Sequence, residues 1–224
     1  MVCRDMTILQ QNTTAKPLTQ KQKIARDFSR AAKQYDGYAI LQREVLEQML
    51  PLLPESWQQQ KVVDAGTGTA ALKRMAPECQ LIGLDVAWGM CEVSKAHQPT
   101  VQADMESLPL ATSSVEGCVS SLAIQWLKHP EKFFAEVYRI THPEGWFVFS
   151  TLDEGTLAEL ELAYRKAALP SPLLSFQRSE ALLRSLQNAG WKVETQQENQ
   201  HYTHYNNVIS LLKHFRGLGA QQKK

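Results

Sequence analysis

The segment from Lys61 to Met90 constrains the fold of this chain more than any other stretch. It begins with the β-branched run KVVD, turns through AGTGTA, and later enters a second apolar run, QLIGL, which ends at Asp85. Gly66 and Gly68 let the backbone turn sharply and approach a ligand without a Cβ in the way. The segment therefore predicts a strand, a helix and a second strand, the unit that holds a nucleoside against a helix N-terminus.

The acid that closes this unit indicates the kind of ligand. Asp85 follows the glycine turn by about 20 residues, the spacing at which an acidic side chain binds ribose hydroxyls in such units. The glycine pattern is G-x-G-x-A, which differs from the G-x-G-x-x-G of nicotinamide and flavin sites, and another acid, Asp64, precedes it. The alternative is an ordinary glycine-containing turn of a doubly wound protein.

The run from Asp64 to Ala70 resembles motif I of the class I S-adenosylmethionine-dependent methyltransferases, in which hydrophobic residues precede D-x-G-x-G-x-G. Ala70 replaces the third glycine and adds a methyl group near the expected methionine end of the cofactor. The resemblance implies S-adenosylmethionine as cofactor, S-adenosylhomocysteine as product, and an α/β Rossmann-like fold with a mostly parallel sheet flanked by helices. The cofactor-binding residues that it implies here are Asp64, Gly66, Thr67, Gly68, Asp85, Val86 and Met90.

Two later tracts resemble further cofactor contacts of this class. The tract Ala103-Asp104-Met105-Glu106-Ser107-Leu108-Pro109 is similar to the family's G/A-D-x-E-x-L-P. There the acid accepts a hydrogen bond from the adenine amino group and the next side chain lies on the ring face, which implies these roles for Asp104 and Met105. The tract from Ser120 to Trp126 resembles S-N-L-A-x-Q-W, and it places Ser121, in place of the family's Asn, beside the cofactor.

Three tracts resemble one branch of the class, the malonyl-[acyl-carrier protein] O-methyltransferases of biotin synthesis. They are F-x-R-A-A-x-x-Y-D from Phe28 to Asp36, T-L-x-x-G-T-L-x-E-L from Thr151 to Leu160, and S-L-L-K-x-x-x-G-x-G-A from Ser210 to Ala220. In that branch N-terminal helices cover the cofactor and the substrate mouth, which implies a catalytic-site position for Tyr35. The tract that ends at Trp126 implies that Gln125 and Trp126 line the methyl-transfer pocket. The alternatives are a tyrosine packed at a helix end and a buried aromatic residue.

Positive side chains are the candidates for binding the substrate. The resemblance implies an arginine just before the aromatic residue of an N-R-F tract, but that position is Ser175. If an arginine pairs with the malonyl carboxylate, Arg178 or Arg165 would have to replace it, while Arg30 is either an anchor or a surface charge. Lys213, on the basic side of the last helix, could contact an acidic acyl-carrier protein or simply be solvated.

Length and composition favour one domain in a reducing compartment. We expect a flexible tail over residues 1–20 and a single methyltransferase domain over 21–224, with cap helices over about 21–50. The formal net charge is +1 and the four cysteines show no C-x-x-C spacing, so neither a nucleic-acid partner nor a metal site is indicated. No signal segment or membrane-spanning run is apparent, and a cytoplasmic location fits best. The oligomeric state is left open.

The last expected strand is Trp191 to Thr195, possibly extended through His201 and Tyr202, after five earlier ones. Family members continue beyond the equivalent of Ala220 with a final strand between the fifth and sixth, and this chain shows none. Either the sixth strand pairs directly with the fifth, or the fifth has an open edge that a partner must cover.

The resemblance implies transfer of the sulfonium methyl group to the free carboxylate of a malonyl thioester, carried by acyl-carrier protein or coenzyme A. That carboxylate is ionised at neutral pH, so the transfer needs positioning and desolvation and no general base. Two alternatives remain: a methyltransferase for another small carboxylate or a carbon acceptor, and a degenerate chain without catalysis. The departures at Ala70, Ser121 and Ser175 and the missing final strand are the basis of the second alternative, a chain that binds the cofactor weakly or serves as an interaction module.

Overall fold

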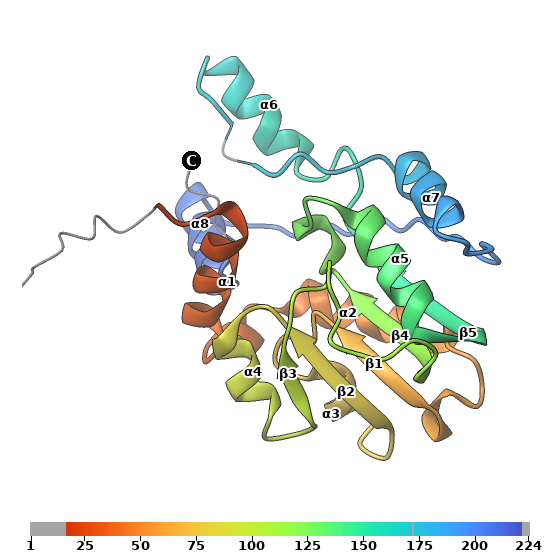
Figure 1. Ribbon diagram of the computed structural model, residues 1–224. Coiled ribbons are helices and arrows are strands. Elements are labelled where there is room, and N and C mark those ends of the chain that lie inside the picture. Colours follow the sequence, from red (N-terminus) through yellow and green to blue (C-terminus); the bar gives the residue numbers. More distant parts are fainter. Residues whose placement is uncertain (1–16, 172, 221–224) are drawn as a thin grey trace, which may run out of the picture.

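The core of the molecule is a sheet of five parallel strands. The structure, a computed structural model, describes residues 17–171 and 173–220. The strands are β1 (Lys61–Ala65), β2 (Gln80–Asp85), β3 (Thr100–Gln102), β4 (Val115–Ser121) and β5 (Thr141–Ser150). They lie in the order β3-β2-β1-β4-β5 (Figure 1). The chain leaves β1 toward one side of the sheet and returns through β4 on the other, so the switch point lies between β1 and β4, where open α/β folds bind ligands.

Helices cover both faces of this sheet, as the sequence predicts for an α/β protein. The helices are α1 (Gln20–Ala31), α2 (Ile40–Met49), α3 (Ala71–Met75), α4 (Trp88–Ser94), α5 (Pro130–Ile140), α6 (Ala158–Lys166), α7 (Ser179–Asn188) and α8 (Val208–Gly217). Of the tail expected over residues 1–20, residues 1–16 lie outside the described part, and α1 begins at Gln20 behind a capping box between Thr19 and Gln22.

Two apolar clusters fix the sheet between its helical layers. On one face Phe133 and Phe134 of α5 are fully buried against β1, β4 and α7. On the other face Leu46 and Met49 of α2 pack with Leu72 of α3 against the opposite sides of β1, β2 and β4. Burying an aromatic or aliphatic side chain contributes about 1.5–3 kcal/mol, so these clusters hold the carboxyl ends of β1, β2 and β4 in fixed register.

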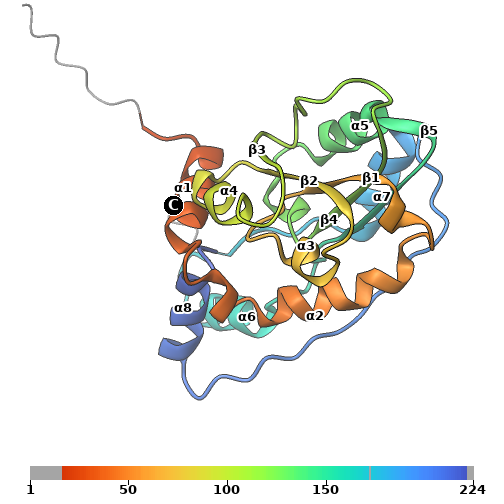
Figure 2. The same cartoon turned by 90° about the horizontal axis from the view of Figure 1, so that it is seen from below.

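The N-terminal and C-terminal helices come together beside the cofactor half of the sheet. Figures 1 and 2 both show α1 and α8 side by side. The ring of Tyr38 leaves no room for a side chain at Gly217, and a Cβ at Gly219 would lie 2.7 Å from the carbonyl oxygen of Asp27. The amide of Gly89, at the start of α4, donates to the hydroxyl of Ser29 on α1 at 3.1 Å. These contacts join the cap to α4, which follows Asp85 in the chain.

The prediction of a sixth strand from Trp191 to Thr195 is wrong. Residues 191–206 are extended but form no ladder, and within the described residues no backbone hydrogen bond links Lys192 through Asn206 to another backbone. The segment runs along the outer side of α2 (Figure 2), where Asn199 donates to Gln48 at 3.4 Å. The β-branched and aromatic residues of the tract suit a strand, but a strand also needs a neighbour. As a result, β5 is an edge strand in the described part of the chain.

Candidate active site

The turn after β1 has the backbone conformation that its glycines predict. Gly66 and Gly68 have φ angles of 76° and 55°, in the left-handed region that favours glycine. A Cβ at Gly66 would collide with the Cβ of Ala123, so glycine lets the turn approach the end of β4. Gly68 has no heavy atom within 4 Å of where its Cβ would be. The turn therefore leaves open space above Gly68 at the switch point of the sheet.

Ala70 occupies the third glycine position of the motif in the same left-handed conformation. Its φ is 63° and ψ is 41°, and it is fully buried as the N-cap of α3. A left-handed conformation costs a residue with a Cβ roughly 1–2 kcal/mol, which explains why this position favours glycine. The fold accepts alanine here without losing the turn.

Asp85 lies at the end of β2 and faces this turn. Its carboxylate accepts hydrogen bonds from the backbone amides of Gly68 at 2.9 Å and Ala87 at 2.8 Å. Burial raises the pKa of Asp85 to about 6, although those amides oppose the shift. The neighbouring Val86 is partly exposed, and Met90 is buried in α4 beneath the cap.

Asp64 is the buried anchor of the turn. Its carboxylate accepts from the hydroxyl of Thr67 at 2.6 Å, and that hydroxyl accepts from the amide group of Gln98 at 2.7 Å. Burial raises the pKa of Asp64 to about 6, the hydrogen bond from Thr67 lowers it, and the charge of Asp85 raises it further. Asp64 and Thr67 thus shape the turn from within. The sequence analysis did not single out Gln98, because an amide 31 residues beyond its partner carries no local signal.

Asp104 and Met105 follow β3 on the neighbouring part of the same sheet edge. The Asp104 carboxylate accepts from the backbone amide of Glu106 at 3.0 Å and remains partly exposed. Met105 is buried, and its sulfur lies 3.7 Å from where a Cβ of Gly66 would be. The glycine turn, Asp85, Asp104 and Met105 therefore lie together at the carboxyl ends of β1, β2 and β3, and we name this region the cofactor crevice.

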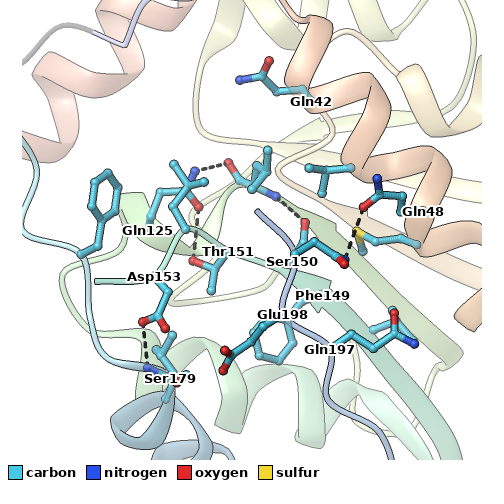
Figure 3. Close-up of a pocket in the computed structure, with 18 of the residues that line it drawn as sticks. Gln42, Gln48, Gln125, Phe149, Ser150, Thr151, Asp153, Ser179, Gln197 and Glu198 are labelled. Carbon is cyan, nitrogen blue, oxygen red and sulfur yellow. Dashed lines mark hydrogen bonds between the residues drawn. The ribbon is translucent and has the colours of Figure 1, made fainter. Parts of the chain in front are cut away.

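The end of β4 forms the wall of this crevice nearest β5. Ser121 and Ser150 place their hydroxyl oxygens 3.3 Å apart across the two strands. Leu122 has a φ of 47°, and its amide donates to the backbone carbonyl of Ser150 at 3.1 Å. Gln125 donates to the carbonyl of Leu122 at 2.8 Å and accepts from Thr151 at 3.4 Å (Figure 3). Gln125 is therefore held in one orientation by β4 and by the segment after β5.

Aromatic side chains from the cap meet this wall. The ring of Phe28 lies 5.1 Å from that of Trp126, edge to face, and 6.4 Å from that of Tyr35. Burial raises the pKa of Tyr35, and the charges of Asp85 and Asp36 raise it further, so its hydroxyl keeps its proton at neutral pH. The predicted catalytic-site residues Tyr35, Gln125 and Trp126 thus come together from segments about 90 residues apart in the chain.

A cavity of about 2700 Å³ opens beside these three residues, and all of them line it. It continues along β5 toward the extended segment after α7, where Phe149, Gln197 and Glu198 lie together (Figure 3). Seven carboxylate side chains and two lysine or arginine side chains line the whole cavity. Carboxylates therefore outnumber cations along its lining.

The four basic residues predicted to bind substrate lie elsewhere. Arg30, Arg165, Arg178 and Lys213 are all exposed, and none lines the cavity. Arg178 pairs with Glu154 at 2.7 Å. Their roles remain predictions. A further tether that the sequence analysis missed joins the cap to the turn: Asp36 accepts from the hydroxyl of Thr69 at 2.6 Å and pairs with Arg74 at 2.8 Å.

Comparison with known proteins agrees with this geometry. Residues 63–149 match the family described as a methyltransferase domain. Two solved structures share the fold: a SAM-dependent methyltransferase from Thermotoga maritima (TM-score 0.60, 22% identity, 75% of this chain and 81% of that one) and the methyltransferase bound to the Trm112 activator of Haloferax volcanii (TM-score 0.65, 18% identity, 87% and 94%). Fold and site together define a class I S-adenosylmethionine-dependent methyltransferase.

Curated relatives identify the family within this class of methyltransferases. The chain is 34% identical to the malonyl-[acyl-carrier protein] O-methyltransferase of Methylovorus sp., over 91% of this chain and 74% of that protein. It is 32% identical to the enzyme of the same name from Serratia marcescens, over 93% and 82%. It is also 32% identical to the biotin biosynthesis bifunctional protein BioHC of Teredinibacter turnerae, over 89% of this chain and 39% of that protein. The chain belongs to the malonyl-[acyl-carrier protein] O-methyltransferase family.

The crevice fits S-adenosylmethionine. The space above Gly68 would be filled by a Cβ, which suits close contact between the turn and the cofactor. Asp85 would accept hydrogen bonds from ribose hydroxyls, and Asp104 and Met105 would offer a carboxylate and an apolar surface for adenine. Among the described residues, no three His, Cys, Asp or Glu side chains are placed to hold a metal ion. Within residues 17–171 and 173–220, no helix is both long and apolar enough to cross a membrane.

Proposed function

We propose that this enzyme transfers a methyl group from S-adenosylmethionine to the free carboxylate of a malonyl thioester, carried by acyl-carrier protein or by coenzyme A, in biotin synthesis. One observation carries the proposal: Tyr35, Gln125 and Trp126, which come from the cap and from the end of β4, line one cavity. The relatives that match across most of the chain are named for this reaction.

When bound, S-adenosylmethionine supplies an electrophilic methyl group, so that a carboxylate oxygen forms the new C–O bond while the C–S bond breaks and its electron pair stays on sulfur. No proton moves in this step, and the chain needs no general base. Tyr35 keeps its phenolic proton and can donate a hydrogen bond to the reacting carboxylate. Its task is to orient the carboxylate, which accounts for much of the rate of such a transfer.

The aromatic residues of the cap keep water away from the reacting pair. Phe28 and Trp126 pack edge to face above the end of β4, and Phe28 comes from α1. Excluding water strips the carboxylate of part of its hydration and strengthens its attraction to the sulfonium charge. Gln125, fixed by Leu122 and Thr151, closes the wall beside them.

The carrier protein is proposed to approach from the α1–α8 side. Exposed cations lie on both helices, Arg30 and Lys33 at the end of α1 and Lys213 and Arg216 on α8. Acyl-carrier proteins are acidic, so this side attracts them, whereas the carboxylates that line the cavity repel them. A cytoplasmic location also belongs to the proposal, because the buried Cys79, Cys91 and Cys118 are all free thiols.

Cofactor binding is tested first, by calorimetric titration with S-adenosylhomocysteine. The wild-type protein is expected to bind in the micromolar range, and Asp85→Ala to weaken binding tenfold or more, about 1.4 kcal/mol. Asp153→Ala, which removes a carboxylate of the cavity away from the crevice, serves as the matched control. An absence of heat and of a thermal shift at millimolar ligand would favour a degenerate chain.

Substrate choice is tested by incubating the enzyme with S-adenosylmethionine and malonyl-acyl-carrier protein, and detecting the methyl ester by mass spectrometry. Acetyl-acyl-carrier protein lacks the free carboxylate and should remain unchanged, while malonyl-coenzyme A tests the need for the carrier. Tyr35→Phe should lower kcat about tenfold or more and leave S-adenosylhomocysteine binding unchanged. Methylation of other small carboxylates in preference to malonyl thioesters would favour the alternative methyltransferase function.

A further inference from the structure

Lys21 joins the N-terminal cap to the purine end of the crevice. Its ammonium group lies 2.6 Å from Oδ2 of Asp104 and 3.1 Å from a carboxylate oxygen of Glu106. Lys21 is on the first turn of α1, whereas both acids follow β3, more than 80 residues later. One cation thus bridges two carboxylates at the position where adenine recognition is expected.

This ion pair contributes little to stability. The side chains of Lys21 and Asp104 are 36% and 38% exposed, and exposed pairs of this kind are worth about 0–1 kcal/mol. Burial lowers the pKa of Lys21, but hydrogen bonds to Asp104 and Glu106 raise it by more, so the ammonium remains charged at neutral pH. The pair therefore matters less for stability than for the position of the Asp104 carboxylate.

Both oxygens of Asp104 are oriented by the protein. The backbone amide of Glu106 donates to Oδ1 at 3.0 Å, and Lys21 donates to Oδ2. Without Lys21, the charges of Asp104 and Glu106 would stand together unneutralised, and their repulsion would turn the Asp104 side chain toward solvent. A carboxylate oxygen has two lone pairs, so Oδ2 can accept a second donor while it remains bound to Lys21.

We propose that Lys21 is a positioning residue for adenine recognition: it holds the Asp104 carboxylate in place to accept a hydrogen bond from the exocyclic amino group of the purine. The proposal rests on the cofactor site described above. Because Lys21 belongs to α1, it also links purine binding to the seating of the cap over the crevice. Lys21 thereby sets the preference for a 6-amino purine over a 6-oxo purine.

The test uses two ligands that differ only at the purine. S-adenosylhomocysteine carries the amino group, and S-inosylhomocysteine carries an oxo group that offers Asp104 no amino donor. Calorimetric titration of the wild-type protein should show preference for the adenosyl ligand. Lys21→Met should lose about five- to tenfold in affinity for S-adenosylhomocysteine and change the affinity for S-inosylhomocysteine less than twofold. Lys21→Arg should restore most of the preference, since it keeps the charge.

Three controls separate positioning from structure. Lys23→Met changes a neighbouring lysine of α1 that forms no ion pair among the described residues, and it should leave both affinities unchanged. Asp104→Ala, which removes both side-chain oxygens, should abolish the preference between the two ligands. The thermal midpoint of Lys21→Met should stay within a few degrees of wild type, since the pair is exposed.

Several results would overturn the proposal. An equal loss of affinity for both ligands in Lys21→Met would indicate that Lys21 only supports the cap. Tighter binding of S-adenosylhomocysteine by this variant would show that Lys21 competes with the purine. An unchanged preference in Asp104→Ala would exclude Asp104 as the acceptor while leaving the proposed methyltransferase function intact. If the wild-type protein bound neither ligand, both this proposal and the proposed methyltransferase function would be contradicted.

Discussion

The half of the molecule that surrounds the cofactor crevice and the part that follows β5 are built in different ways. In the first, β1 is flanked by parallel neighbours on both sides, and its Val62 and Val63 are fully buried. In the second, the described residues 151–171 and 173–220 contain three helices and extended segments without a ladder, and Leu169 and Tyr202 are 58% and 74% exposed. The comparison teaches that this chain builds its cofactor side from local, self-supporting units, whereas its acceptor side depends on contacts between distant segments.

Amide hydrogen exchange should give the largest difference between the two parts. Amides in the ladders of β1 and β4 should exchange only on global unfolding, whereas those from Lys192 to Tyr205 have no backbone acceptor within the described residues. We expect protection to differ by roughly a thousandfold or more. Mass spectrometry of peptides from both regions measures this directly. Equal protection would mean that the extended segment is paired in solution and that the comparison fails.

A pair of glycine substitutions should show the next largest difference. Both Gly66 and Gly155 have positive φ angles, 76° and 91°, but only Gly66 lacks room for a Cβ, because of Ala123. Gly66→Ala should cost about 3–5 kcal/mol of stability and abolish cofactor binding, whereas Gly155→Ala should cost about 1–2 kcal/mol. Chemical denaturation of both variants compares them. Similar costs would show that collision at the turn is relieved by movement of the β4 end.

The pH dependence of stability and of cofactor affinity should have opposite signs. Asp64 and Asp85 keep their protons to about pH 6 in the folded state but only to about pH 4 when unfolded. The folded state therefore binds more protons between these values, and the free energy of unfolding should fall as pH rises through this window, by up to about 3 kcal/mol for the buried Asp64.

Affinity for S-adenosylhomocysteine should instead rise from pH 5 to pH 7, because an ionised Asp85 accepts hydroxyl donors at both oxygens. Denaturation and titration at matched pH values test the two signs. Asp64→Asn should reduce the slope of the stability profile, to which Asp85 still contributes, while leaving the rise in affinity. Stability that increases with pH over this window in the wild type would contradict the assigned burial of these carboxyls.

The smallest expected effect is a gain at Ala70. Ala70→Gly relieves the left-handed strain, roughly 1–2 kcal/mol, but loses a buried methyl group and gains unfolded-chain entropy. The net result should be a protein about 0.5 kcal/mol more stable, seen as a small rise in thermal midpoint. Ala65→Gly, at a buried strand position with ordinary φ, is the matched control and should destabilise. A loss of stability in Ala70→Gly would show that its methyl group outweighs the strain.

The sequence predicts the cofactor half well because its signals are local. The glycine turn, the apolar strands around it and the helix from Pro130 are each set by neighbouring residues, and the structure has them within a few residues of the expected bounds. The acids Asp64 and Asp85 follow from their spacing to the same turn. Lys21 carries no such signal, since its partners are brought to it only by the packing of α1 on α4.

The part after β5 was harder to predict, for a physical reason. Trp191 and Val193 have the composition of a strand, yet they pack as side chains against the α5 cluster while their backbone finds no neighbour. Strand formation requires a paired edge, and nothing in a local sequence window specifies that edge. The positions of Arg165 and Arg178 relative to the cavity depend on the same distant geometry, so their assignment from sequence alone was equally weak.

The contact between α1 and α8 has a consequence for the order in which the protein is made. A ribosome releases the N-terminal helix early, but Gly217, which packs on Tyr38, and Gly219, which packs on Asp27, emerge 179 and 192 residues after those partners. The strands and helices from β1 to β5 can assemble before then, since β5, the last of them, ends at Ser150. The cap must wait for Gly217 and Gly219, so the nascent chain acquires its sheet first and a complete lid over the cofactor last.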